Sequence, residues 1–156
     1  MNKIAVLVLV TLMMGLSACV NTDKSSVSQS EVVATKANFQ AGKIQDISNQ
    51  ELQQLLDKGV VLVDIRLPQE WQETGIVAGS RPLTLFDESG KIEPTFLDTF
   101  QQWVKPEQPV ILICRSGNRS RVGAELLVQQ AGYQQVYNVT DGINQWLAEG
   151  RRVVKP

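Results

Sequence analysis

Residues 110–120 read VILICRSGNRS, and this stretch decides the fold. Its first four residues are apolar without interruption, which is typical of a strand buried on both faces of a parallel sheet. A helical pattern begins at Ser120 and ends at Gly132. The polar segment between them starts at Cys114 and joins the carboxyl end of the strand to the helix. Ligands bind at junctions of this kind in open α/β sheets, so we expect the functional site here.

Strand and helix patterns alternate on both sides of that stretch. Ser48 and Glu51 have the spacing of a capping box, at the start of a helix that Gly59 ends. Further strands are predicted at residues 60–63 and 135–139, and a strand or extended segment at residues 82–86. Further helices are predicted at residues 68–73, 96–103 and 143–147. The alternation predicts an α/β domain with a central, mainly parallel sheet and helices on both faces.

The polar segment has the composition of a site for an anion or a thiolate. Backbone N–H groups converge in a tight strand-to-helix loop, and the helix N-terminus adds about half a positive charge. Gly117 and Asn118 tolerate the positive φ that a curling loop requires. Cysteines at helix N-termini have pKa values below the free value of about 8.5, so we expect Cys114 to be a nucleophile. An inert core cysteine is the alternative, but polar residues follow it directly.

The overall composition narrows the chemistry. The chain of 156 residues has no histidine, which excludes Ser-His catalysis, Cys-His catalysis and histidine metal ligands. Its two cysteines are too few for a thiolate metal site, and neither a metal nor a cofactor is expected. The net charge of −1 gives no reason to expect nucleic-acid binding. Positive charge is concentrated locally instead, at Arg115, Arg119 and Arg121.

The N-terminus has the pattern of an export signal. Lys3 precedes an apolar run over residues 4–16, which has the length of a signal-peptide core. Residues 16–19 read LSAC and resemble the lipobox of bacterial lipoproteins. That resemblance implies that Cys19 carries the lipid and becomes the mature N-terminus, which would anchor the protein to a membrane.

This interpretation divides the chain into three regions. They are a signal peptide at residues 1–18, a lipid-attached flexible tether at residues 19–42 and the folded domain at residues 43–156. Val20 is not the Asp that marks inner-membrane retention, so the resemblance implies an outer-membrane lipoprotein that faces the periplasm. An uncleaved membrane helix over residues 4–20 is the alternative, although such a span would be short.

The loop after the apolar strand also indicates a family. Residues 114–120 resemble the active-site loop of rhodanese-like sulfurtransferases, and the resemblance extends over about residues 44–154. Further matching residues are Asp64, Ile65, Arg66, Glu70, Trp71, Gly79, Ser80, Asp141, Gly142, Ile143, Trp146 and Gly150. The resemblance implies that Cys114 takes sulfane sulfur from a thiosulfate-like anion, carries it as a persulfide and passes it to a thiol acceptor.

The resemblance assigns roles to the neighbours of the cysteine. The predicted substrate-binding residues are Arg115, Ser116, Gly117, Asn118, Arg119 and Ser120. By position, Arg115 is the preferred cation for the anionic donor, whereas Arg119 either binds substrate or braces the loop by pairing with an acid. The predicted supporting residues are Asp64, Arg66 and Glu70. Structural ion pairs would explain Arg66 and Glu70 at least equally well.

Two other functions stay open at this point. Phosphatases of similar architecture need Cys-x5-Arg, a loop wide enough for phosphate, but here Arg119 is the fifth residue after Cys114 and Ser120 is the sixth. This spacing favours attack on sulfur. The other alternative is a non-catalytic module that binds anions, sulfur species or a partner protein at the cell envelope.

At residues 75–80 the chain reads GIVAGS where many relatives have GHIPGA, and we expect only a small local difference there.

Overall fold

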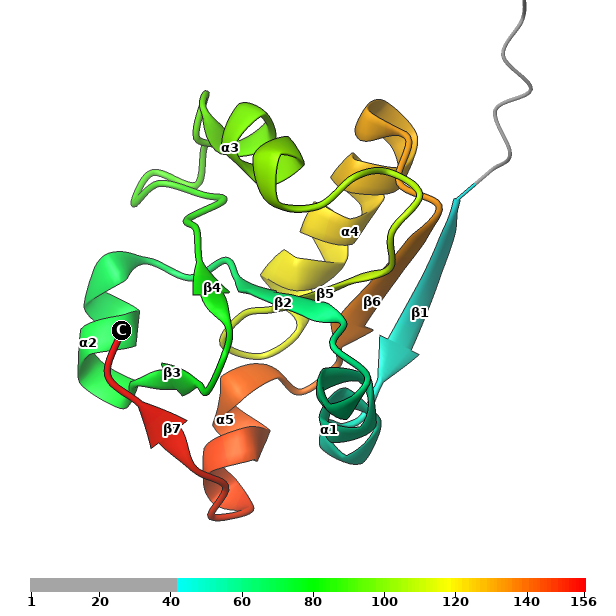
Figure 1. The fold of residues 1–156 in the computed structure, drawn as a ribbon. Coiled ribbons are helices and arrows are strands. Elements are labelled where there is room, and N and C mark those ends of the chain that lie inside the picture. The colour runs from blue at the N-terminus through cyan, green and yellow to red at the C-terminus, as the bar shows by residue number, and fades with distance from the viewer. Residues whose placement is uncertain (1–41) are drawn as a thin grey trace, which may run out of the picture. The chain divides into compact units, whose positions relative to one another are not determined.

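The computed structural model describes residues 42–156, which form a five-stranded parallel sheet with helices on both faces (Figure 1). The predicted fold class is therefore confirmed. The strand order is β1 (Lys43–Ile47), β6 (Gln135–Val139), β5 (Val110–Ile113), β2 (Val61–Asp64) and β4 (Arg81–Pro82). Strand β5 lies at the centre, so the segment that follows it emerges at the middle of the carboxyl edge of the sheet.

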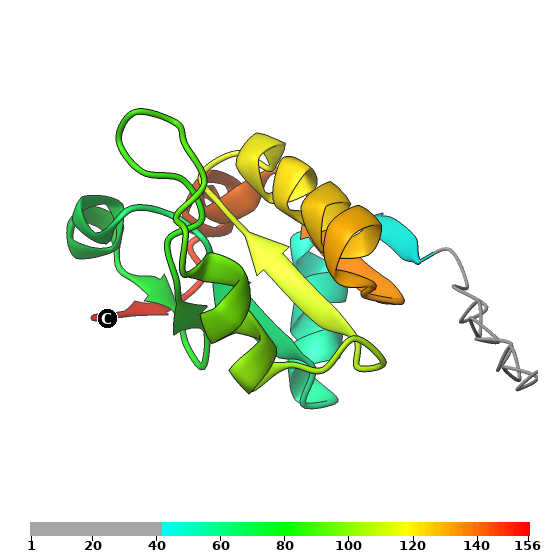
Figure 2. The ribbon, with the colours of Figure 1, turned by 90° about the horizontal axis from the view of Figure 1, so that it is seen from above.

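Two pairs of helices cover the sheet, one pair on each face. Helices α3 (Phe96–Trp103) and α4 (Asn118–Ala131) pack on one face, as Figure 2 shows from above, and α1 (Asn49–Asp57) and α5 (Gly142–Ala148) pack on the other. Successive residues of β5 point to opposite faces, so Leu112 belongs to the α3–α4 core and both Ile111 and Ile113 belong to the α1–α5 core. Burial on both sides explains the uninterrupted apolar run.

The capping box predicted at the start of α1 is present. The Ser48 hydroxyl accepts a hydrogen bond from the Glu51 N–H at 3.3 Å, and the Glu51 carboxylate accepts one from the Ser48 N–H at 2.8 Å. These two bonds satisfy donors that the first turn of a helix otherwise leaves free.

The segment at residues 82–86, predicted as a strand or an extended segment, is a strand only at its start. Strand β4 is only Arg81–Pro82, although the Leu83 N–H still donates to the Asp64 carbonyl at 3.0 Å. The physical reason lies in the partner strand, since β2 ends at Asp64 and the chain turns into α2 (Pro68–Thr74). Beyond that point the pairing continues only in single contacts, from the Leu85 N–H to the Ile65 carbonyl at 3.3 Å and in an isolated antiparallel bridge between Phe86 and Ile92.

A small second sheet was not predicted from the sequence. Strands β3 (Ile76–Val77) and β7 (Val153–Val154) pair antiparallel beside α2 (Figure 1). Ile76, which replaces the histidine of many relatives, is only 5% exposed in this sheet. An apolar side chain therefore suits the position. Among residues 42–156, no helix is long and apolar enough to cross a membrane.

Candidate active site

The loop over residues 114–117 connects β5 to α4 at the centre of the carboxyl edge of the sheet. The Cys114 side chain lies at the end of β5 and is 1% exposed, as a free thiol. Gly117 is the N-cap of α4 with a φ of 84°, and a Cβ on it would collide with the carbonyl oxygen of Thr140. Helix α4 consequently begins at Asn118, two residues before the predicted start. The first N–H groups of α4 have no acceptors within the helix and face this loop.

The loop rests on the N-terminus of α5. The Ile143 N–H donates to the Cys114 carbonyl at 2.9 Å, and the Asn144 N–H donates to the Arg115 carbonyl at 3.1 Å. Gly142 has a φ of 59°, and a Cβ on it would collide with the Cys114 carbonyl oxygen. Two helix N-termini therefore meet at the loop, and α5 uses its free N–H donors to hold the backbone of the loop in place.

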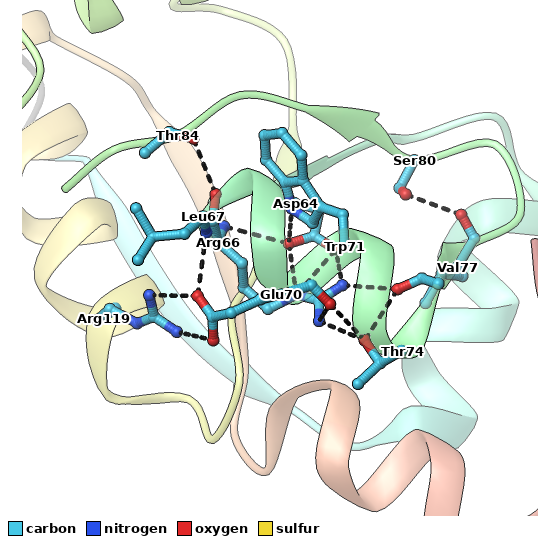
Figure 3. A network of polar contacts seen from close by, with 11 residues as sticks. Asp64, Arg66, Leu67, Glu70, Trp71, Thr74, Val77, Ser80, Thr84 and Arg119 are labelled. Carbon is cyan, nitrogen blue, oxygen red and sulfur yellow. Dashed lines mark hydrogen bonds and ion pairs between the residues drawn. The ribbon is translucent and has the colours of Figure 1, made fainter. Parts of the chain in front are cut away.

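Arg119 is bound to an acid from α2. Its two terminal nitrogens donate to the two carboxylate oxygens of Glu70 at 2.8 and 2.6 Å, in the bidentate arrangement that suits a guanidinium (Figure 3). The hydrogen bonds with Glu70 raise the pKa of Arg119. Burial would raise the pKa of Glu70, but the hydrogen bonds from Arg119 and from the Leu67 N–H hold it below its usual value. Both groups are therefore ionised, and the pair fastens the start of α4 to α2.

The predicted supporting residues form a buried frame beside the loop. Asp64 and Arg66 are 0% and 1% exposed and pair at 2.7 Å, and the Trp71 indole N–H also donates to Asp64 at 3.1 Å (Figure 3). Arg66 donates further to the Thr74 hydroxyl and the Gly75 carbonyl, both in or after α2. Arg66 and Glu70 thus both form structural ion pairs, with Asp64 and Arg119 as the respective partners.

The other predicted binding residues differ in exposure. Arg115, Ser116 and Asn118 are exposed, whereas Ser120 is fully buried. Within the described part of the chain, Arg115 forms no ion pair, and it lines a cavity of about 40 Å³ together with Glu70 and other residues of α2 and α5. The free cation of the loop is therefore Arg115, and Arg119 is already neutralised.

The sequence analysis did not single out Asn138 and Asp46, which are connected to the site through Ser120. The Ser120 hydroxyl lies 3.3 Å from the Cys114 sulfur and 2.6 Å from the side-chain oxygen of Asn138 on β6. The Asn138 amide nitrogen in turn donates to Asp46 on β1 at 2.8 Å. One signal could have found Asn138, because it is a polar residue in the middle of a buried strand, where polar groups need partners.

Comparison with known proteins decides the family. Residues 48–149 match the sequence profile of the rhodanese-like domain, which covers well over half of the chain. The chain belongs to the rhodanese-like family. The resemblance of this domain to the family is thereby confirmed.

Several known proteins are similar to this chain over most of their own length. The thiosulfate sulfurtransferase GlpE from Pseudomonas aeruginosa is 30% identical over 102 residues, which are 65% of this chain and 83% of GlpE. A rhodanese-related protein from Thermoplasma volcanium has a solved structure with a TM-score of 0.56 and 27% identity, covering 72% of this chain and 99% of that one. The structure of Rv0390 from M. tuberculosis gives a TM-score of 0.55 and 30% identity, over 65% and 80% of the two chains.

Proposed function

We propose that this rhodanese-like protein is a sulfurtransferase that carries sulfane sulfur as a persulfide on Cys114. The observation that supports it best is the position of Cys114 in the strand-to-helix loop, between the N-termini of α4 and α5. N–H donors and the dipole of α4 stabilise negative charge there without a histidine. The similarity to GlpE, a thiosulfate sulfurtransferase, supports the same reaction.

The proposed reaction needs only Cys114, a sulfur donor such as thiosulfate and an acceptor. The Cys114 thiolate attacks the outer sulfur of thiosulfate, a new S–S bond forms, and sulfite leaves with the electron pair of the bond that breaks. An acceptor thiolate or cyanide then attacks the terminal sulfur, and the Cys114 thiolate leaves. Arg115 binds the anionic donor, since it is exposed and unpaired within residues 42–156, and the N–H groups of residues 118–120 hold the charged persulfide. Arg119, paired with Glu70, braces the loop.

Mass spectrometry tests the covalent step directly. Thiosulfate should add about 32 Da, one sulfur atom, to the wild-type protein, and cyanide should remove it. Cys114→Ser should show neither the adduct nor thiocyanate formation. Wild-type protein that binds thiosulfate without forming the adduct would instead support the non-catalytic module, and faster turnover of an aryl phosphate than of thiosulfate would support a phosphatase.

A matched pair of variants tests the role assigned to the free cation. Arg115→Ala should raise the KM for thiosulfate about tenfold, because a charge-assisted hydrogen bond to the donor is lost. Arg152→Ala removes an exposed cation beside β7 and serves as the control, with an unchanged KM expected. An equal effect of the two substitutions would contradict a specific role for Arg115.

We further propose that the protein is a lipoprotein of the bacterial cell envelope, attached through Cys19 to the outer membrane and facing the periplasm. Cys19, the signal peptide at residues 1–18 and nearly all of the tether at residues 19–42 lie outside the described residues. The sequence pattern around Cys19 is the support for this proposal. Membrane fractionation of a Cys19→Ala variant is its test.

A further inference from the structure

Polar side chains form a continuous chain from the protein surface to the sulfur of the nucleophile. Arg121 on α4 pairs with one carboxylate oxygen of Asp46 at 3.0 Å, and the other oxygen accepts from the Asn138 amide at 2.8 Å. The Asn138 oxygen lies 2.6 Å from the Ser120 hydroxyl, which lies 3.3 Å from the Cys114 sulfur. Asp46 and Asn138 are directly opposite each other in the β1–β6 register. Three separate elements thus contribute to one hydrogen-bonded chain.

The chemistry of these groups determines which way the Ser120 proton points. An ionised carboxylate only accepts hydrogen bonds, so Asp46 must face the NH2 group of Asn138 and the amide oxygen must face Ser120. A hydroxyl has only one proton to donate. Three acceptors surround the Ser120 hydroxyl, namely the side-chain oxygen of Asn138, the Gly117 carbonyl and the Cys114 sulfur. The contact with Asn138 is the shortest of the three, so the proton lies there. Towards Cys114 the hydroxyl can therefore only accept.

We propose that Asp46 and Asn138 are positioning residues that hold the Ser120 hydroxyl as an acceptor and so favour the protonated thiol of Cys114. When the thiol gives its proton to solvent, the hydroxyl must turn to donate to the thiolate, and the Asn138 oxygen loses its partner. The inner sulfur of a persulfide carries no charge, so in that state the hydroxyl can return to Asn138. The hydrogen-bonded chain therefore disfavours the thiolate state of Cys114, but neither the thiol state nor the persulfide state. This inference rests on the proposed function, because it concerns the same nucleophile.

Other polar and charged groups lie around the Cys114 loop, and the test leaves them in place. Arg119 of α4 interacts electrostatically with Cys114 and is itself paired with Glu70 of α2. Asp64 at the end of β2 is paired with Arg66, and α5 contributes the backbone N–H groups of residues 143 and 144. Arg115 follows Cys114 directly in the loop. None of these groups belongs to the hydrogen-bonded chain of Asp46, Asn138 and Ser120.

The experiment measures how tightly Cys114 holds its proton, by the ultraviolet absorbance of the thiolate as a function of pH. A Cys19→Ala background leaves Cys114 as the single thiol. Asp46→Asn lets the Asn138 amide turn, which frees the Ser120 proton for the sulfur. The proton affinity of Cys114 should then fall about fivefold, as expected for one gained hydrogen bond. Glu125→Gln, which removes another carboxylate bound to Arg121, is the control and should change nothing.

A Ser120→Ala background separates the hydrogen-bonded chain from the simple loss of a negative charge. Asp46→Asn should have little effect there, because the hydroxyl that transmits the change is gone. An equal fall in proton affinity with and without Ser120 would show that the charge acts through space and would overturn the proposal. Asn138→Ala removes the competing acceptor and should act in the same direction as Asp46→Asn, which keeps the test valid if that variant does not fold. The titration needs no sulfur donor, so its result is independent of sulfurtransferase activity.

Discussion

Gly117→Ala should destabilise the protein more than Gly79→Ala, although the two glycines have almost the same φ angle. Their φ angles are 84° and 82°, so an alanine meets the same left-handed strain at both sites. The surroundings differ. A Cβ on Gly79 would meet nothing within 4 Å, whereas a Cβ on Gly117 would collide with the carbonyl oxygen of Thr140. The comparison therefore isolates the packing of the Cys114 loop against the end of β6.

The magnitude follows from two costs. The left-handed conformation costs an alanine about 1–2 kcal/mol, which is the whole expected loss for Gly79→Ala. At Gly117 the backbone must also move to admit the methyl group, and overpacking of this kind costs about 1–3 kcal/mol more. We therefore expect a loss of about 2–5 kcal/mol for Gly117→Ala. Sulfur transfer should fall with it, because the displaced loop carries Cys114.

Urea denaturation of the two purified variants and of the wild type measures the difference. The midpoint should fall for both variants with an unchanged m-value, and further for Gly117→Ala. Equal losses, within about 0.5 kcal/mol, would refute the claim that the loop is packed tightly against β6.

Three further predictions concern other parts of the molecule. Glu70→Gln should lower the urea midpoint near neutral pH but not in acid. The pKa of Glu70 is lower in the folded state than the unfolded value of about 4.5. The stabilisation from the charged carboxylate is therefore complete above the unfolded pKa and is lost as the pH falls through the folded pKa. The two proteins should therefore converge at low pH, and a constant difference would contradict the role of the charged pair. Asp64→Leu should cost about 3–5 kcal/mol, because it leaves the buried Arg66 charge without a partner. Adding Arg66→Met to Asp64→Leu should recover part of that loss in urea titrations, and a single-variant loss below about 1 kcal/mol would contradict the argument. Cys19→Ala should release the protein from membranes or block its maturation, and unchanged fractionation would exclude a lipid anchor.

Local patterns in the sequence predicted the elements around the site. The apolar run at residues 110–113 indicated the central strand, and the spacing of Ser48 and Glu51 indicated the start of α1. These predictions held because burial on both faces and helix capping depend on residues that are neighbours in the chain. Strands β3 and β7 were missed, since two residues are too few to show an alternation.

The sequence by itself predicted the α/β fold and the strand-to-helix loop, and it singled out Cys114 as the candidate nucleophile. Only the tertiary structure decided which charges are paired and which distant side chains meet at the loop. Arg119 is neutralised by Glu70, 49 residues away, and Asn138 is oriented by Asp46, 92 residues away. Periodicity and capping report contacts within a few residues, whereas ion pairs and hydrogen bonds depend on which distant segments the sheet brings side by side.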